Sequence, residues 1–165
     1  MILIEKNTDN NFTAIRAIAK EVWPIAYGSI LSNEQLNYMM EMMYTIEALQ
    51  IQSEIKKHHF ILVMEDKKAL GFASYEMNYD KTNQTKIHKI YILFTQQGKG
   101  NGKMLIDYIE NEAKKHHQKT LILNVNKYND ALHFYKKVGF SISFEEVIPI
   151  GNGYVMDDYV MQKKL

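Results

Sequence analysis

The sequence contains no cysteine. This absence excludes disulfide bonds, thiolate metal ligands and a cysteine nucleophile, and it suits a protein of a reducing compartment. Long apolar runs are also missing, since no stretch approaches the roughly 18 residues that a membrane-spanning helix needs. The first ten residues do not combine a basic segment with an apolar one, as a secretory signal would. We therefore expect a cytoplasmic protein without a membrane segment.

A strong charge of one sign is missing as well. The 165 residues include 20 Lys and Arg and 19 Asp and Glu, which leaves a net charge of +1. No charge field is therefore expected to recruit nucleic acid or an anionic membrane surface. The hydrophobic share of 46% and the charged share of 24% are typical of a globular protein. The length predicts one domain over residues 1–165 and leaves the oligomeric state open, with a homodimer as one alternative.

Hydrophobic periodicity predicts a succession of strands and helices. Ser32 and Thr45 are expected to cap two of the helices, and the first helix is expected to end near Trp23-Pro24, because proline interrupts helical hydrogen bonding. The expected elements are a strand at 2–5, helices around 15–22, 33–43 and 46–55, strands at 60–64, 70–77 and 86–93, a helix around 104–113, a strand at 120–126, a helix around 131–138, and strands at 140–148 and 154–162. This order indicates an α/β (α+β) fold with a mixed sheet.

A glycine-rich segment, Gln97–Lys103, lies between an expected strand and an expected helix. Glycines let main-chain N–H groups approach an anion, and a helix N-terminus adds unpaired donors and a partial positive charge. The side chains of Lys99 and Lys103 add full charges. These features predict a pyrophosphate site, and the alternative for this segment taken alone is a connection that binds no ligand.

The segment matches neither of the common nucleotide-binding loops. The triphosphate-binding pattern ends in Gly-Lys-Ser/Thr, but here Gly102-Lys103 is followed by Met104. The dinucleotide-binding pattern requires a third glycine at the position of Lys103. A protein that binds a nucleoside triphosphate is therefore disfavoured.

Two motifs resemble the signatures of the GNAT superfamily of N-acetyltransferases. The first is Gln-x-x-Gly-x-Gly at Gln97–Gly102, which follows the strand KIHKIYIL and opens a helix. The second, further along the chain, is Asn129–Phe140, which contains Phe134-Tyr135 and Gly139. The resemblance covers nearly the whole chain. It implies a single-domain GNAT fold, with a mixed, mostly antiparallel sheet of six to seven strands flanked by helices, and an acetyl-CoA-dependent N-acetyltransferase.

The resemblance also implies which residues bind acetyl-CoA. Main-chain amides of the loop would bind the pyrophosphate, and main-chain groups at the end of the preceding strand would bind the pantetheine arm and polarise the acetyl carbonyl. Family members commonly have proline where this chain has Phe94, but main-chain groups do this work. Asn129 also suits a helix N-cap. The implied coenzyme-binding residues are Ile92, Leu93, Phe94, Gln97, Gly98, Lys99, Gly100, Asn101, Gly102, Lys103 and Asn129.

Tyr135 matches the tyrosine that lies near the coenzyme sulfur in many GNAT members. A phenol there can donate a proton to the departing thiolate, which is general-acid catalysis. The alternative for this side chain is core packing beside Phe134. Without cysteine, direct attack of the amine in a ternary complex is the expected mechanism.

A base must accept the proton of the attacking amine, and His88 is our catalytic candidate for this role. Alternation along its strand places His88 on one face with Ile90 and Ile92, and a structural role is the alternative. Other candidates for the base are the carboxylates Glu76, Asp157 and Asp158. The remaining histidines do not pair with carboxylates at metal-ligand spacing, so we expect no metal; they are His58, His59, His116, His117 and His133.

Two segments are similar to a bacterial branch related to spermidine/spermine acetyltransferases: VWPIAYGSILSNEQLNYMMEMMY and GNGYVMDDYVM. This similarity implies a polyamine or another small primary amine as the acceptor. The acidic pairs Glu145-Glu146 and Asp157-Asp158 could attract such a cation. Trp23, Tyr27 and the cluster Met39–Tyr44 are expected to be mostly core, with part of them available to line an acceptor pocket. The alternative function is an acetyl-CoA-binding regulatory protein with little or no catalysis.

Overall fold

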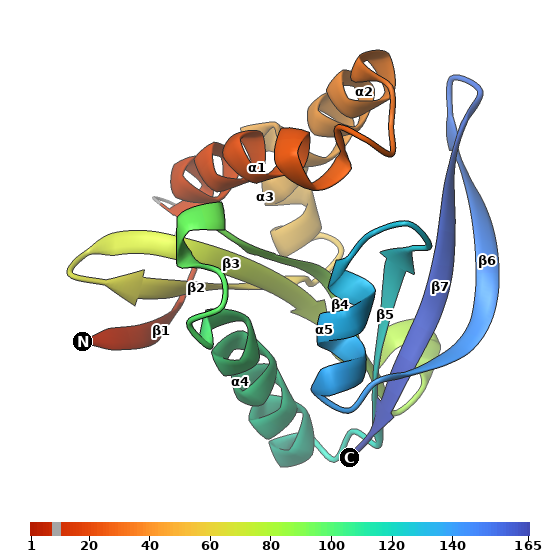
Figure 1. Ribbon diagram of the computed structural model, residues 1–165. Coiled ribbons are helices and arrows are strands. Elements are labelled where there is room, and N and C mark those ends of the chain that lie inside the picture. The colour runs from red at the N-terminus through yellow and green to blue at the C-terminus, as the bar shows by residue number, and fades with distance from the viewer. Residues whose placement is uncertain (8–10) are drawn as a thin grey trace.

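A seven-stranded sheet forms the middle layer of the molecule in the computed structural model, which describes residues 1–7 and 11–165 (Figure 1). The order of strands and helices confirms the sequence prediction. The strands are β1 (Ile2–Lys6), β2 (His59–Glu65), β3 (Lys68–Glu76), β4 (Gln84–Ile92), β5 (Thr120–Asn126), β6 (Ser141–Gly151) and β7 (Tyr154–Lys164). The helices are α1 (Asn11–Tyr27), α2 (Asn33–Tyr44), α3 (Ile46–Glu54), α4 (Asn101–Lys115) and α5 (Ala131–Lys137). None of the helices described is long and apolar enough to cross a membrane.

Helices cover both faces of the sheet, whose strand order is β1-β2-β3-β4-β5-β7-β6. Helices α1 to α3 lie on one face, and α4 and α5 lie on the other (Figure 1). Each face buries its own apolar cluster. Phe72 and Trp23 lie in the cluster under α1 to α3, whereas Leu105 and Ile106 of α4 lie in the cluster on the opposite face. The burial of these two clusters holds the three layers together.

Local signals explain where several helices begin. The side chain of Ser32 accepts a hydrogen bond from the amide of Gln35 at 3.2 Å, and that of Thr45 accepts one from the amide of Ala48 at 3.1 Å. Both predicted caps are therefore confirmed. The predicted end of the first helix is wrong, because α1 continues through Pro24 to Tyr27. Proline has no N–H group, so one helical hydrogen bond is missing at Pro24. Burial of the neighbouring Trp23, which is 2% exposed, stabilises the helix at this point.

Strand β6 also extends beyond its predicted end. It continues through Pro149 to Gly151, where the pairing with β7 becomes irregular. Strand β6 is an edge of the sheet, and proline is tolerated on an edge strand because its missing N–H is not needed for pairing.

Strands β4 and β5 are the only parallel neighbours among the strands described, and they separate halfway along their length. Their pairing runs from Gln84 and Thr120 to Ile87 and Leu123 and then stops. Beyond this point β4 still continues to Ile92 and β5 to Asn126. The two strands therefore form the sides of a wedge that opens towards α1, α4 and α5.

Candidate active site

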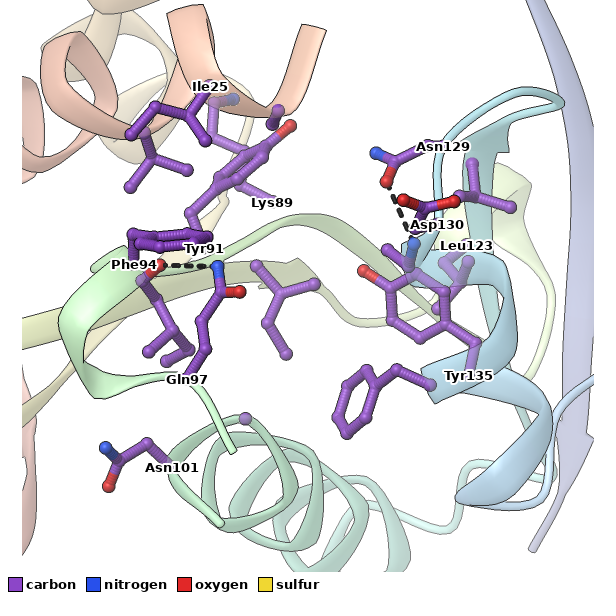
Figure 2. Close-up of a pocket in the computed structure, with 18 of the residues that line it drawn as sticks. Ile25, Lys89, Tyr91, Phe94, Gln97, Asn101, Leu123, Asn129, Asp130 and Tyr135 are labelled. Atoms are coloured by element: carbon purple, nitrogen blue, oxygen red, sulfur yellow. Dashed lines mark hydrogen bonds between the residues drawn. The ribbon is translucent and has the colours of Figure 1, made fainter. Parts of the chain in front are cut away.

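A cavity of about 850 Å³, which we call the wedge cleft, opens where β4 and β5 separate. This volume is typical of a pocket for a small molecule or cofactor. Its walls come from α1, the end of β4, the loop before α4, the start of α4, β5 and α5. Figure 2 shows Tyr91 and Gln97 on one wall, with Asn129 and Tyr135 on the opposite wall.

The glycine loop lies at one end of the wedge cleft and has the geometry expected of an anion cradle. Gly98 and Gly100 have φ values of +74° and +85°, and a Cβ atom added to either would meet nothing within 4 Å. Gly100 is the N-cap of α4 and has no side chain to satisfy the free N–H groups of the first helical turn. Gly102 lies against the ring of Phe134, where an added Cβ would approach to 3.1 Å. The loop therefore presents bare main-chain donors, and this is what a pyrophosphate requires.

Three polar side chains of the loop already have partners within the protein. Lys103 forms an exposed ion pair with Asp107 at 2.6 Å, and Lys99 donates to the side chain of Gln96 at 3.1 Å. An exposed pair of this kind contributes little stability, so an anion could take either lysine from its partner. The Nδ2 of Asn101 donates to the carbonyl of Gln96, whereas its buried Oδ1 has no partner among the described residues.

The end of β4 contributes main-chain groups, but two of them are already engaged. The carbonyl oxygen of Ile92 accepts a hydrogen bond from the side-chain amide of Gln97 at 3.2 Å, drawn as a dashed line in Figure 2. The N–H of Leu93 donates to the carbonyl of Leu70 in β3. Phe94 follows the strand and is 60% exposed. A ligand amide could displace the Gln97 side chain from Ile92, but it could not use the Leu93 N–H without breaking the sheet.

Asn129 and Tyr135 form the wall on the α5 side. The Oδ1 of Asn129 accepts a hydrogen bond from the amide of Ala131 at 2.9 Å. Asn129 thus supports the start of α5, but the predicted N-cap position belongs to Asp130. Tyr135 is 7% exposed and packs near Phe134 and Phe140, while its hydroxyl points into the wedge cleft (Figure 2). Burial raises the pKa of Tyr135, so its hydroxyl stays protonated at neutral pH.

A second cavity of about 90 Å³, the side cavity, lies between the sheet and helices α1 and α2. Aromatic and methionine side chains line it, including Trp23 and Met39, as the sequence suggested for part of this group. Five residues line both cavities and thus form a common wall: Tyr27, His88, Lys89, Tyr91 and Asn124. A molecule in the side cavity would therefore meet one in the wedge cleft at this wall.

A β-bulge in β4 places His88 in this wall. Lys89 pairs with Ser74 of β3, but the next pair joins Ile87 to Tyr75, so His88 is an extra residue without a partner in the ladder. The prediction that His88 shares a face with Ile90 is wrong, because the bulge interrupts the alternation. Its ring lies on the side of α1 to α3, next to Lys89 in the side cavity.

His88 is held by two residues from other elements. Its Nε2 lies 2.8 Å from the carboxylate of Glu76, and its ring stacks on that of His58 with centroids 3.9 Å apart and an angle of 12° between the rings. The Nε2 of His58 lies 3.5 Å from the same oxygen of Glu76. The expectation that His58 does not pair with a carboxylate at metal-ligand spacing is therefore wrong.

The donor atoms of His58, Glu76 and His88 lie within 4.8 Å of one another, a separation that metal ligands also show. A metal ion lies in the plane of each imidazole that binds it, and two stacked, nearly parallel rings do not direct their lone pairs to one point. As it stands, Glu76 is hydrogen-bonded to His88, and the Nε2 of His58 lies 3.5 Å from the same oxygen. The group therefore fits proton transfer better than metal binding.

Burial keeps both histidines neutral. Burial lowers the pKa of His58 to about 4, and the nearby charge of Lys89 acts in the same direction. Burial also lowers the pKa of His88, with further contributions from His58 and Lys89. The carboxylate of Glu76 opposes this shift, but His88 is only 20% exposed, so the downward direction dominates. A neutral imidazole has a lone pair that can accept a proton, but the burial that keeps it neutral also weakens it as a base.

Sequence reasoning missed three residues of the common wall and its support: His58, Lys89 and Tyr91. None of them carries a local signal, because strand pairing and the bulge bring them together. Of the other proposed bases, Glu76 lines neither cavity and contacts His88. Asp157 also lines neither cavity, and it pairs with Lys127 at 3.0 Å. Asp158 lines the side cavity.

Known proteins share this architecture. Residues 12–140 match the acetyltransferase (GNAT) family, and no curated protein matches the chain significantly. The chain is similar to the PaiA N-acetyltransferase of Thermoplasma acidophilum, solved in complex with coenzyme A, with a TM-score of 0.84, 23% identity, and coverage of 100% of this chain and 99% of that chain. It is also similar to the ribosomal-protein-S18-alanine N-acetyltransferase of Escherichia coli, with a TM-score of 0.72, 16% identity, and coverage of 99% and 94%. At these identities the structural likeness demonstrates a common fold.

Proposed function

This chain belongs to the acetyltransferase (GNAT) family and is an acetyl-CoA-dependent N-acetyltransferase, and we propose that its acceptor is a primary amine of a small molecule. The observation that carries this proposal is the common wall. It separates a large cleft with an anion cradle from a small aromatic cavity, and it contains a neutral histidine. The side cavity has a volume of only about 90 Å³. A polyamine or another small amine therefore fits it better than a folded protein surface does.

The wedge cleft is the proposed site of acetyl-CoA. Main-chain N–H groups of Gly98–Lys103 would bind the pyrophosphate, and the open space at Gly98 and Gly100 supports this placement. The pantetheine arm would run along the end of β4 and bind the Ile92 carbonyl in place of the Gln97 side chain. Leu93 and Phe94 would flank the arm, and Asn129 would contact it from the opposite wall.

His88 is the proposed base. Alkyl amines are mostly protonated at neutral pH, with pKa values near that of lysine, so the acceptor must lose a proton before it attacks. Glu76 binds the Nε2–H of His88 and thereby leaves Nδ1 with the lone pair that accepts this proton. Bound acetyl-CoA supplies a thioester whose carbonyl carbon is attacked directly by the amine, and coenzyme A leaves as the thiol.

Tyr135 is the proposed acid that completes the proton balance. Its buried hydroxyl faces the wedge cleft and remains protonated, because burial raises its pKa. It can donate a proton to the departing sulfur and recover one from solvent. The ammonium group loses one proton to His88 before the attack, and the same nitrogen loses a second proton to solvent as the amide forms. The sulfur gains one proton from Tyr135, which recovers it from solvent, so the reaction releases one proton overall.

An acceptor screen with a free-thiol readout tests this proposal. Purified protein, acetyl-CoA and a panel of small primary amines are mixed, and coenzyme A release is followed over time. We expect release that depends on one or more amines and yields the acetylated amide by mass spectrometry. Binding of acetyl-CoA without amine-dependent release across the panel would contradict the proposed acceptor and favour a regulatory protein.

A further inference from the structure

Tyr79 packs against the proposed base from outside both cavities. His88 is the bulged residue of β4, so strand pairing does not fix its orientation and its neighbours must do so. The ring of His58 covers one face of the imidazole. The ring of Tyr79 meets it edge-to-face, with centroids 6.0 Å apart and an angle of 73° between the planes. Tyr79 is half-buried and lines neither cavity, so it meets no ligand there.

The backbone around Tyr79 is strained. Tyr79 begins a short 3-10 helix, η1 (Tyr79–Lys81), in the connection from β3 to β4. Asn78, Asp80 and Lys81 have φ values of +52°, +55° and +59°, in the left-handed region that residues other than glycine adopt at a cost. Strain of this kind persists where the surrounding structure over-determines the conformation, and it is enriched at functional sites. The turn therefore holds Tyr79 in a fixed place.

A buried glutamine from another part of the chain holds the start of this turn. Gln118 is 4% exposed and lies in the connection from α4 to β5. Its Oε1 accepts a hydrogen bond from the main-chain N–H of Asn78 at 2.9 Å, and its Nε2 donates to the Oδ1 of Asn78 at 2.8 Å. Buried polar groups that are satisfied in this way rigidify the structure around them. Asn78 is thereby locked in the left-handed conformation that leads into Tyr79.

Contacts on the other side hold Tyr79 itself. Its carbonyl accepts hydrogen bonds from the N–H and the hydroxyl of Thr82, at 3.1 and 2.6 Å. The Nζ of Lys86 lies 4.8 Å from the centre of the Tyr79 ring, within the range of a cation–π interaction. The same Nζ donates to Asn124 of the common wall at 2.6 Å. The Tyr79 ring therefore contacts His88 directly, and it contacts the common wall through Lys86.

The geometry points to a positioning role, and we propose that Tyr79 fixes the imidazole of His88 and shields its hydrogen bond to Glu76 from water. This inference rests on the proposed role of His88 as the base. The side chains of His88 and Glu76 are 20% and 26% exposed, so water is close to their bond. An imidazole that exchanges this bond for water is free to turn and to move its proton between the two ring nitrogens. Only the tautomer with the proton on Nε2 leaves Nδ1 free to accept one from the amine.

Nitrogen NMR of the histidine rings tests the inference without turnover, with the signals of His88 identified by their loss in His88→Ala. Tyr79→Ala removes the ring, and Tyr79→Phe is the matched control that keeps it. In the wild type and in Tyr79→Phe we expect one tautomer of His88, with the proton on Nε2, and no titration between pH 6 and 8. In Tyr79→Ala we expect both tautomers.

The titration of His88 gives a second readout in the same samples. Burial lowers the pKa of His88, and water admitted by Tyr79→Ala should raise it towards the ordinary value of 6.5 by more than one unit. The titratable and charged groups that face His88 are Lys56, His58, Glu76, Tyr79, Lys86 and Lys89. All but Tyr79 are the same in the three proteins, so a difference between them reports the ring.

Steady-state kinetics connect this effect to the reaction. In Tyr79→Ala we expect kcat to fall by about 10- to 100-fold, because a small misplacement of a catalytic group is costly, whereas KM for acetyl-CoA should not change. An unchanged tautomer and pKa of His88 in Tyr79→Ala would overturn the inference, and so would an equal change in Tyr79→Phe. A change of tautomer in Tyr79→Ala alone, in a protein that acetylates no amine, would support the position of Tyr79 and refute the proposed function.

Discussion

The hydroxyl groups of Tyr27 and Tyr91 are hydrogen-bonded at 3.0 Å, although the two residues are 64 positions apart. Tyr27 ends α1 and Tyr91 lies near the end of β4, and both line the wedge cleft and the side cavity. This bond therefore ties the helical layer to the strand at the wall where the donor and the acceptor are proposed to meet.

Removal of either hydroxyl should destabilise the protein in a manner that is not additive. Tyr27→Phe leaves the partly buried hydroxyl of Tyr91 without its partner, at a cost of about 1–2 kcal/mol. The double variant with Tyr91→Phe leaves no such unpaired group, so it should cost less than the sum of the two single changes. Urea unfolding of the three variants measures the coupling. Strict additivity would show that the bond contributes nothing.

Tyr135→Phe should lower turnover more than it lowers coenzyme affinity. The change removes one oxygen, which is the proposed proton donor, and leaves the packing near Phe134 and Phe140 in place. General-acid catalysis typically contributes about 10²–10⁴ in rate, so we expect kcat to fall by about 10²-fold. Steady-state kinetics and acetyl-CoA titration separate the two effects. An equal loss of affinity and turnover would contradict the role of proton donor.

The acid side of the pH profile should not show the ordinary ionisation of a histidine. Because burial lowers the pKa of His88, this residue stays neutral and active as a base when the pH falls from 8 to 6. An acceptor whose own pKa is below 6 removes the ionisation of the amine from the profile. With it, kcat/KM should be flat between pH 6 and 8 in the wild type, and His88→Ala should lower it less than it lowers kcat/KM for an alkyl amine, because this acceptor is already neutral. A fall in wild-type activity centred near pH 6.5 would contradict the lowered pKa.

Lys89 should make the stability of the protein depend on pH. Burial lowers its pKa from 10.5 to about 7, so between these values the unfolded chain binds a proton that the folded chain does not. Stability contributed by the neutral lysine is therefore lost as the pH falls from about 10.5 to about 7, and it is constant below that. Lys89→Met lacks this loss, and its stability relative to wild type should rise by roughly 3 kcal/mol between pH 10 and pH 7. Urea unfolding at both pH values checks this, and a constant difference would contradict it.

Much of the fold could be predicted because its signals are local. The caps at Ser32 and Thr45 depend on a side chain and an amide three positions away, and the alternation in β5 follows from neighbouring residues. The glycine loop can be recognised in the sequence for the same reason, because left-handed backbone angles such as those of Gly98 and Gly100 favour glycine. The prediction that the first helix ends near Pro24 is wrong because distant packing, rather than local hydrogen bonding, sets the end of α1.

The arrangement around His88 could not be predicted from the sequence. Alternation assumes a regular strand, and nothing near His88 shows that β3 and β4 pair with one extra residue in β4. The contacts with Glu76 and His58 depend on this bulge and on strands that are distant in the chain. The wedge that forms the cleft likewise depends on where the pairing between β4 and β5 stops, which is a property of the whole sheet.

The central claim is that coenzyme binds at the glycine loop in the wedge cleft, and calorimetric titration of acetyl-CoA into two glycine variants tests it most directly. Gly100→Glu and Gly153→Glu introduce the same side chain at φ values of +85° and +78°, each with nothing within 4 Å of the new Cβ. Both variants carry a similar backbone strain, but Gly153 lies in the β6–β7 turn. We predict that Gly153→Glu binds acetyl-CoA as the wild type does and that Gly100→Glu shows no measurable binding. Equal binding by the two variants would contradict the account.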